Sequence, residues 1–176
     1  MIEVREARLP QDAPAIAAID TSFATDVIYD AVATGLGFEL RERRLAAPLT
    51  KRFPLDDLGD ESRPWSQAFV AEQDGRIVGF AAAAYEAWNR RLTLWHLYVD
   101  PPARGHGVGR RLVDRIAELA QALGARHMWL ETSNLNAPGV AAYQALGFTL
   151  TGLDLALYDG TPAEGEVALF FSKPVG

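Results

Sequence analysis

The sequence predicts an α/β fold in which a mixed, mostly antiparallel central sheet is flanked by helices. Strand-like and helix-like segments alternate in the middle of the chain, and hairpin signals flank that alternation, which together indicate a mixed sheet. The sequence contains no internal repeat. At 176 residues the chain has the length of one domain, so we expect a single domain over residues 1–176.

The N-terminal elements are a strand and a helix. Residues 2–7 alternate between apolar and polar side chains as a strand does. Pro10 then opens a helix that carries Ile16 and Ile19.

Two less regular stretches follow. Residues 21–42 are expected to be irregular, with Gly35 and Gly37 interrupting them before a short helix. Residues 48–64 are polar and contain proline and glycine, which predicts a loop. Loops of this length often act as lids or binding segments.

The middle of the chain is the most regular part. Residues 68–72 and 76–86 are two strands joined at Asp74-Gly75, a hairpin signal. Residues 91–99 form the next strand. Alternation along this strand places Leu94, His96 and Tyr98 on one face and Trp95, Leu97 and Val99 on the other.

A long amphipathic helix starts near Arg110 and ends at Gly124. Its apolar stripe is predicted to consist of Leu112, Ile116, Leu119 and Leu123.

The last third of the chain alternates again between strand and helix. Residues 127–132 are a strand, Asn136 is the expected N-cap of a short helix, and Gly147 ends that helix. Two closing strands are expected over residues 148–158 and 166–172.

Composition narrows the classes of function. No apolar run approaches the roughly 20 residues of a membrane span, so a membrane role is not expected. The N-terminus has no apolar signal core and the chain has no cysteine, so we expect a cytoplasmic protein without a metal site. The net charge of −6 disfavours binding to nucleic acid and favours cationic ligands.

The most informative segment is residues 104–109, which read Arg-Gly-His-Gly-Val-Gly directly before the long helix. A glycine-rich turn that opens a helix points backbone N–H groups and the positive end of the helix dipole at one spot, so it suits phosphate. No lysine followed by Ser or Thr comes after Gly109, and the spacing is not Gly-x-Gly-x-x-Gly, which excludes a Walker loop and a dinucleotide fingerprint. The alternative is a turn that only lets the helix start.

The remaining pattern, Arg-x-x-Gly-x-Gly, resembles the pyrophosphate loop of the GNAT superfamily of acetyl-CoA-dependent N-acyltransferases. Two flanking segments share the resemblance in the same order and spacing. They are Leu97-Tyr98-Val99-Asp100-Pro101 and Asn136-x-x-Gly-Val-x-x-Tyr143-x-x-x-Gly147-Phe148.

This resemblance implies the GNAT acyltransferase fold and acetyl-CoA as cosubstrate. Tyr143 would protonate the leaving thiolate, although its helical spacing from Val140 also suits a core residue. Asn136 would reach the pantetheine arm, and a capping role is compatible with that. The implied cofactor-binding residues are Leu97, Tyr98, Val99, Arg104, Gly105, His106, Gly107, Val108, Gly109, Arg110, Asn136 and Tyr143.

A narrower resemblance is to the streptothricin acetyltransferases, which acetylate an amine of a cationic antibiotic. It rests on residues 87–93, on Leu130-Glu131-Thr132, and on the tail from Gly147 to Tyr158 and from Glu166 to Phe170. An acidic acceptor site is therefore implied, with Asp20, Asp26, Asp30, Asp154 and Tyr158 as candidate substrate-binding residues. The chain departs from this subfamily at Trp95, His96 and Tyr98, where carboxylates are typical.

The expected mechanism is direct attack of a primary amine on acetyl-CoA in a ternary complex. An amine with a pKa near 10 needs a base at neutral pH, and the candidates are His96, Glu86 and Glu131, or a water relayed to one of them. His127 is expected to be structural.

Three alternatives stay open. The acceptor could be another small amine or a protein amine, the chain could be an acyl-CoA-binding sensor without turnover, or it could be an interaction domain that keeps only the fold. A homodimer is compatible with the sequence.

Overall fold

The computed structural model describes residues 1–176, and the chain folds as two compact units. The first unit comprises Met1–Thr21, Arg52–Leu130 and Lys173–Gly176, and the second comprises Ser22–Lys51 and Glu131–Ser172. No helix in either unit is long and apolar enough to cross a membrane.

Seven strands make up a mixed, mostly antiparallel sheet, which confirms the predicted fold class. In the first unit the strand order is β1-β4-β5-β6-β7, and only β6 and β7 are parallel. The strands are β1 (Ile2–Glu6), β4 (Gln67–Gln73), β5 (Arg76–Glu86), β6 (Arg91–Val99) and β7 (His127–Ser133), whose last residues belong to the second unit.

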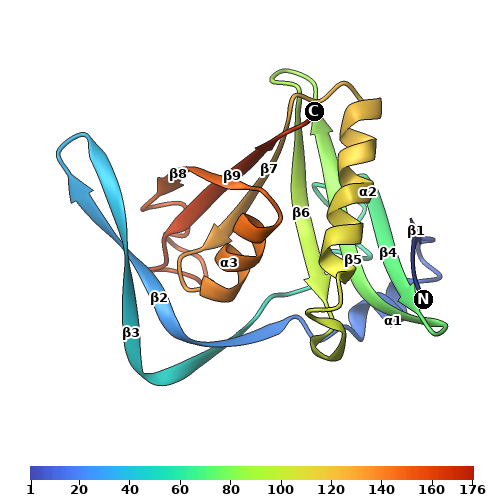
Figure 1. Ribbon diagram of the computed structural model, residues 1–176, viewed down its shortest axis with the longest axis horizontal. Helices are drawn as coiled ribbons and strands as arrows, with labels where there is room; N and C mark the ends of the chain where they lie inside the picture. Colours follow the sequence, from blue (N-terminus) through green and yellow to red (C-terminus); the bar gives the residue numbers. More distant parts are fainter. The chain divides into compact units, whose positions relative to one another are not determined.

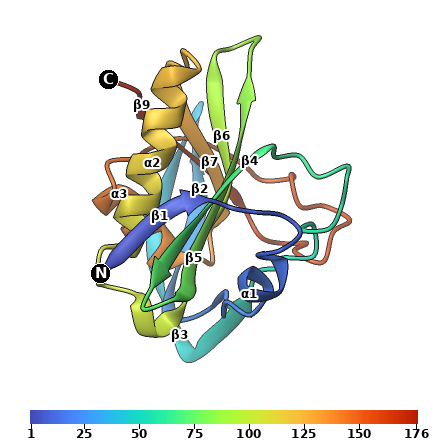
Figure 2. The same cartoon turned by 90° about the vertical axis from the view of Figure 1, so that its right-hand side faces the viewer.

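The helices of the first unit cover both faces of these strands (Figure 2). Helix α2 (Val108–Ala122) packs on β4, β5 and β6, whereas the short α1 (Ala13–Ala17) packs on β5 from the other side. A 3₁₀ turn, η1 (Pro101–Ala103), leads from β6 toward α2. The core on the α1 side is a cluster of Ile16, Ile19, Leu58, Trp65, Val70, Phe80 and Ala82.

Helix α2 begins two residues earlier than the sequence predicts, because Gly107 adopts a left-handed conformation (φ 83°) and serves as its N-cap. Glycine at position 79 lets this end of α2 approach β5. A Cβ on Gly79 would lie 2.8 Å from Val108 Cγ1 and 3.0 Å from Leu112 Cδ1.

The apolar stripe of α2 also differs in part from the prediction. The expected Leu123 follows the helix as its C-cap and is 40% exposed. The buried positions are Val108, Leu112, Ile116 and Ala120, which lie four residues apart, together with Val113 beside Leu112.

The predicted division of β6 into two faces is wrong at its N-terminal half. Ala82 lies opposite His96, and Ala83 lies opposite Leu94, so Trp95 is an extra residue in a β-bulge. Consecutive strand residues point to opposite faces. His96 therefore shares a face with Ala82, and Leu94 lies on the other face with Ala83.

The second unit contains a long hairpin that the sequence did not predict. Residues 21–42 were expected to be irregular with a short helix, but β2 (Ser22–Thr34) and β3 (Gly37–Arg52) pair as a separate two-stranded sheet (Figure 1). Gly35, with φ 69°, provides the turn between them. The predicted loop at residues 48–64 accordingly starts only after Arg52.

The remaining elements of the second unit are one helix and an antiparallel strand pair. Helix α3 (Ala137–Ala145) contacts β2, and β8 (Thr149–Asp154) pairs with β9 (Ala168–Pro174). Strand β8 is shorter than the predicted 148–158, because Asp154 Oδ1 accepts the Ala156 N–H at 2.8 Å and turns the chain. Tyr158 therefore lies in a turn region and not in a strand.

Candidate active site

The glycine loop of the first unit has the geometry that the sequence predicts for an anion site. Gly105 and Gly107 have φ angles of 79° and 83°, and a Cβ on either would meet no atom within 4 Å. No side chain caps Gly107, so the first turn of α2 presents backbone N–H groups at an open surface. The loop therefore fits a pyrophosphate group.

Arg104 connects this loop to the end of β6 through hydrogen bonds. Its Nε donates to the Val99 carbonyl at 2.9 Å, and its Nη2 donates to the Asp20 carbonyl at 3.2 Å. The Asp20 N–H in turn donates to Asp100 Oδ1 at 3.0 Å. Arg104 and Asp20 therefore help to hold the glycine loop in place. The sequence suggests binding roles for both residues in addition.

The edge of β6 that holds Leu97, Tyr98 and Val99 separates from β7. Strand β6 pairs with β7 only over Arg91–Thr93, while its register with β5 continues to Val99. An extended ligand arm can add to such an edge as a further strand.

His96 lies in an aromatic and acidic environment that includes a residue missed by sequence reasoning. Its Nε2 is 2.8 Å from Asp57 Oδ2, and the Trp65 Nε1–H donates to the same oxygen at 2.6 Å. The imidazole also lies beside the rings of Phe80 and Tyr98, with centroids 5.9 and 5.6 Å away. Asp57 and Trp65 carry no motif and stand before β4, so only the contact reveals them.

Glu86, a candidate base, is held as a carboxylate by three neighbours. Thr93 Oγ1 donates to it at 2.6 Å, Arg91 at 3.2 Å and Trp88 at 3.2 Å. The Thr93 hydrogen bond, followed by Arg91, lowers the pKa of Glu86. Of the two carboxylate candidates, Glu86 is therefore a weaker proton acceptor than Glu131, whose pKa is raised.

In the second unit, Tyr143 packs between Phe148 and Phe171, whose ring centroids lie 6.2 and 6.1 Å away. Burial, and then the nearby negative charge of Glu131, raises the pKa of Tyr143 to about 12. The phenol is therefore protonated at neutral pH. This is the state that a general acid requires.

Glu131 and Tyr158 form a pair in the same unit, with the Tyr158 hydroxyl donating to Glu131 Oε1. Burial raises the pKa of Glu131, and burial followed by the Glu131 hydrogen bond raises the pKa of Tyr158. A second pair, Lys51 and Glu166, also contacts Ser133 through Glu166. Sequence reasoning missed Lys51 and Ser133, which match no motif.

Asn136 caps α3 as predicted. Its Oδ1 accepts the Gly139 N–H at 3.0 Å, and its Nδ2 donates to Thr132 Oγ1 at 3.0 Å. A Cβ on Gly139 would lie 2.2 Å from Asn136 Nδ2. This contact explains why glycine follows three residues after the asparagine.

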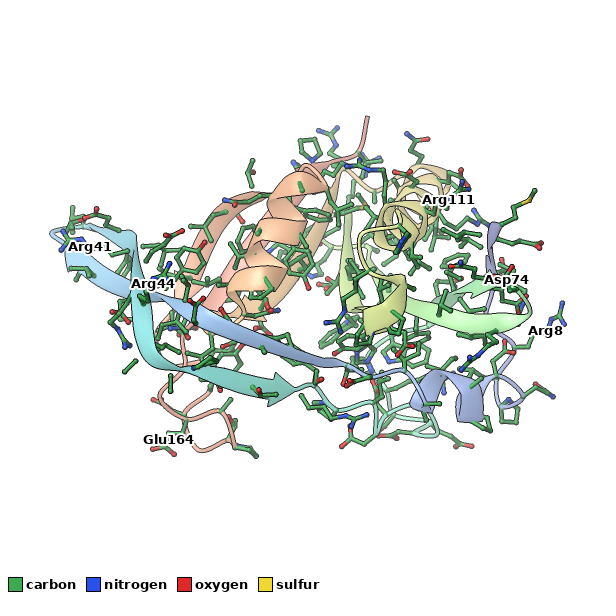
Figure 3. All side chains as sticks on the ribbon, turned by 60° about the horizontal axis from the view of Figure 1, so that its bottom comes forward. Arg8, Arg41, Arg44, Asp74, Arg111 and Glu164 are labelled. Carbon is green, nitrogen blue, oxygen red and sulfur yellow. The ribbon has the colours of Figure 1, made fainter.

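Two of the candidate acceptor carboxylates are already paired with arginine. Asp26 binds Arg44 at 2.9 Å and Asp30 binds Arg43 at 2.6 Å across the exposed hairpin. Arg44 is labelled on this hairpin in Figure 3. Because these charges are offset, Asp26 and Asp30 offer less attraction to a cationic acceptor than the sequence suggests.

Comparisons with known proteins identify the family of this chain. The family model described as "Acetyltransferase (GNAT) family" matches residues 35–148. A streptothricin acetyltransferase of Streptomyces lavendulae is 47% identical over 98% of this chain and 94% of its own length. A second streptothricin acetyltransferase, from Escherichia coli, is 31% identical over 86% of this chain and 85% of its own length.

Solved structures show the same fold. The crystal structure of nourseothricin acetyltransferase has a TM-score of 0.89 and 49% identity, with 99% of both chains covered. A putative streptothricin acetyltransferase of Bacillus anthracis, solved in complex with acetyl coenzyme A, has a TM-score of 0.83 and 23% identity over 99% of both chains. At that identity it supports the fold alone. Taken with the family model and the relative that is 47% identical, these similarities show that the chain belongs to the GNAT acetyltransferase family.

Proposed function

We propose that this N-acetyltransferase transfers the acetyl group of acetyl-CoA to a primary amine of streptothricin or a closely similar cationic antibiotic. The observation that carries the proposal is the 47% identity to the S. lavendulae streptothricin acetyltransferase, because it covers 98% of the chain. It thus includes the segments outside the motifs that GNAT enzymes share.

The backbone amides of residues 105–110 would hold the pyrophosphate of acetyl-CoA, which supplies the activated acetyl thioester. The open space above Gly105 and Gly107 supports this assignment. His106 is exposed beside the amides, and Val108 anchors the loop to the core. The β6 edge from Leu97 to Val99 would take the pantetheine arm, and an amide there would polarise the thioester carbonyl.

Tyr143 would protonate the thiolate as it leaves. The supporting observation is its raised pKa of about 12 in a mostly aromatic environment. A phenol that stays neutral at pH 7 keeps its proton until a strongly basic thiolate forms nearby. Asn136 would support the same end of the cosubstrate while it caps α3.

The base that takes the proton of the amine would be His96 or Glu131. Burial raises the pKa of Glu131, and a carboxylate with a higher pKa is a stronger base. The hydrogen bonds of Glu86 lower its pKa, so we rank Glu86 last.

The acceptor would bind through Glu131, Asp154 and Tyr158, since a cationic amine needs negative or hydrogen-bonding partners. Asp154 lies at the turn after β8, and Tyr158 contacts Glu131. Asp20 would add long-range attraction, whereas Asp26 and Asp30 would contribute little because each is paired with an arginine.

We further propose that the two compact units together form one acetyltransferase domain over residues 1–176, since the family match takes in parts of both. We also propose that the protein is cytoplasmic and that it forms a homodimer. Light scattering would test the dimer against the chain mass of 19.2 kDa.

A panel of amines assayed for thiol release with acetyl-CoA tests the acceptor. We expect streptothricin to give the highest kcat/KM, ahead of polyamines, amino acids and a peptide α-amine. A higher kcat/KM for a polyamine or an amino acid would overturn the acceptor assignment and leave the acetyltransferase intact. Binding of acetyl-CoA without thiol release for any amine would indicate a sensor.

A further inference from the structure

We propose that Asp57 is a positioning residue for catalysis: it holds His96 in the tautomer that accepts a proton from the acceptor amine. The inference rests on the proposed N-acetylation, but not on streptothricin as the acceptor. Asp57 lies in the segment between β3 and β4 and belongs to no motif.

The hydrogen bonds around Asp57 determine which nitrogen of His96 carries the proton. Trp65 Nε1–H can only donate, so Asp57 Oδ2, at 2.6 Å, must accept. A carboxylate oxygen accepts a second bond as well, which makes His96 Nε2, at 2.8 Å, the donor. The neutral imidazole therefore bears its lone pair on Nδ1.

That lone pair has no partner within the chain. His96 Nδ1 is buried and makes no hydrogen bond, and Asp57 Oδ1 is buried and equally without a partner. An unsatisfied buried acceptor costs roughly 1–3 kcal/mol. A basic nitrogen kept in this state is suited to receive a proton from a group outside the chain.

Asp57 is the carboxylate that contacts the imidazole of His96. The faces of Phe80 and Tyr98 and the edge of Trp65 enclose the ring. Tyr98 is the other titratable neighbour, and the Arg63 guanidinium lies 4.5 Å from the Trp65 ring centroid. Asp57 makes a hydrogen bond to the imidazole, and a carboxylate in that position stabilises an imidazolium once Nδ1 is protonated.

One proton moves from the acceptor to His96. An N–H bond of the acceptor's ammonium group breaks and the Nδ1–H bond of His96 forms, directly or through one water. The neutral amine keeps the electron pair that attacks the thioester carbon. The imidazolium later releases its proton to solvent.

Asp57→Asn tests the proposal. The side-chain amide that replaces the carboxylate can donate to His96 Nε2, which favours the opposite tautomer with hydrogen on Nδ1. We expect kcat with the best amine at pH 7 to fall about 10²-fold, as for loss of a general base, with the KM for acetyl-CoA unchanged. The loss should shrink at least tenfold as the pH approaches the amine pKa of about 10, where the amine needs no base.

Asp56→Asn is the matched control, since it removes the same charge one residue away from an exposed side chain. We expect wild-type kinetics from it. In the His96→Gln background, Asp57→Asn should add little further loss, because the two residues act as a unit. A loss that is equal at all pH values, or equal in the two aspartate-to-asparagine variants, would overturn the proposal.

A measurement without any acceptor separates this inference from the proposed function. The ring ¹⁵N spectrum of neutral His96 should show hydrogen on Nε2 in the wild type and on Nδ1 in Asp57→Asn. Only three histidines need to be assigned. Hydrogen on Nδ1 in the wild type would refute the role of Asp57 even if the chain acetylates streptothricin.

Discussion

At position 143 a single oxygen distinguishes a general acid from a packing residue. Tyr143→Phe keeps the ring contacts with Phe148 and Phe171 and removes only the hydroxyl. We expect kcat to fall about 10²-fold or more, with the KM for acetyl-CoA little changed, since the proton matters in the transition state. Steady-state kinetics at pH 7 measure this.

Tyr29→Phe is the matched control, because Tyr29 also has a pKa raised by burial and interacts with Glu42 on the hairpin. It should leave kcat unchanged. Equal turnover in the two variants would show that Tyr143 only packs, or that solvent protonates the thiolate fast enough.

Glu131 links burial to the pH dependence of stability. Its pKa is raised by burial, so the folded state binds this proton more tightly than the unfolded state does. The resulting stability is present below the unfolded pKa, and it is lost as the pH rises through the higher folded value.

Glu131→Gln removes this titration and can still accept the Tyr158 hydroxyl. The melting temperature of the variant, relative to wild type, should therefore rise between pH 4 and pH 7. Thermal unfolding across that range tests it, and a constant difference would mean that Glu131 titrates alike in both states.

At the scale of elements, the glycine loop and α2 carry the cosubstrate assignment. Gly107→Glu places a carboxylate at the open N-terminus of α2, where φ is 83°. We expect at least a tenfold loss of acetyl-CoA affinity, roughly 1.4 kcal/mol, measured by calorimetry. Gly160→Glu, at φ 72° with equally open space, carries the same backbone strain away from the loop and should bind normally.

Periodic elements were predictable from the sequence, and elements defined by contacts were not. β5, β6 and α2 have the alternation or helical spacing that burial on a sheet demands, and the loop at 104–109 was predicted with them. The β2–β3 hairpin was missed because most β3 side chains are exposed. A strand that is exposed on both faces does not show the alternation of apolar and polar residues by which strands are predicted.

The bulge at Trp95 shows the same limit inside a correctly predicted strand. One extra residue in β6 reverses the faces on either side of it, and no composition signal marks it. The Asp57 to His96 contact spans 39 residues and joins an irregular segment to a strand, so it needs the folded chain.

At the scale of the whole molecule, charge connects composition to the acceptor. The chain carries 23 acidic against 17 basic residues, so its net field attracts a cationic substrate. We expect the KM for streptothricin to rise about threefold or more as salt increases from about 0.01 to 1 M, because the screening length falls from about 30 to 3 Å.

The matched measurement uses a neutral amine acceptor at the same salt concentrations, for which KM should stay nearly constant. Arginine pairing at Asp26 and Asp30 leaves the remaining carboxylates as the source of the attraction. If the KM for streptothricin does not change with salt concentration, direct contacts at the acceptor site select the substrate, and the net charge of the chain does not. A neutral amino acid acetylated faster than streptothricin at every salt concentration would assign the chain to a different acceptor.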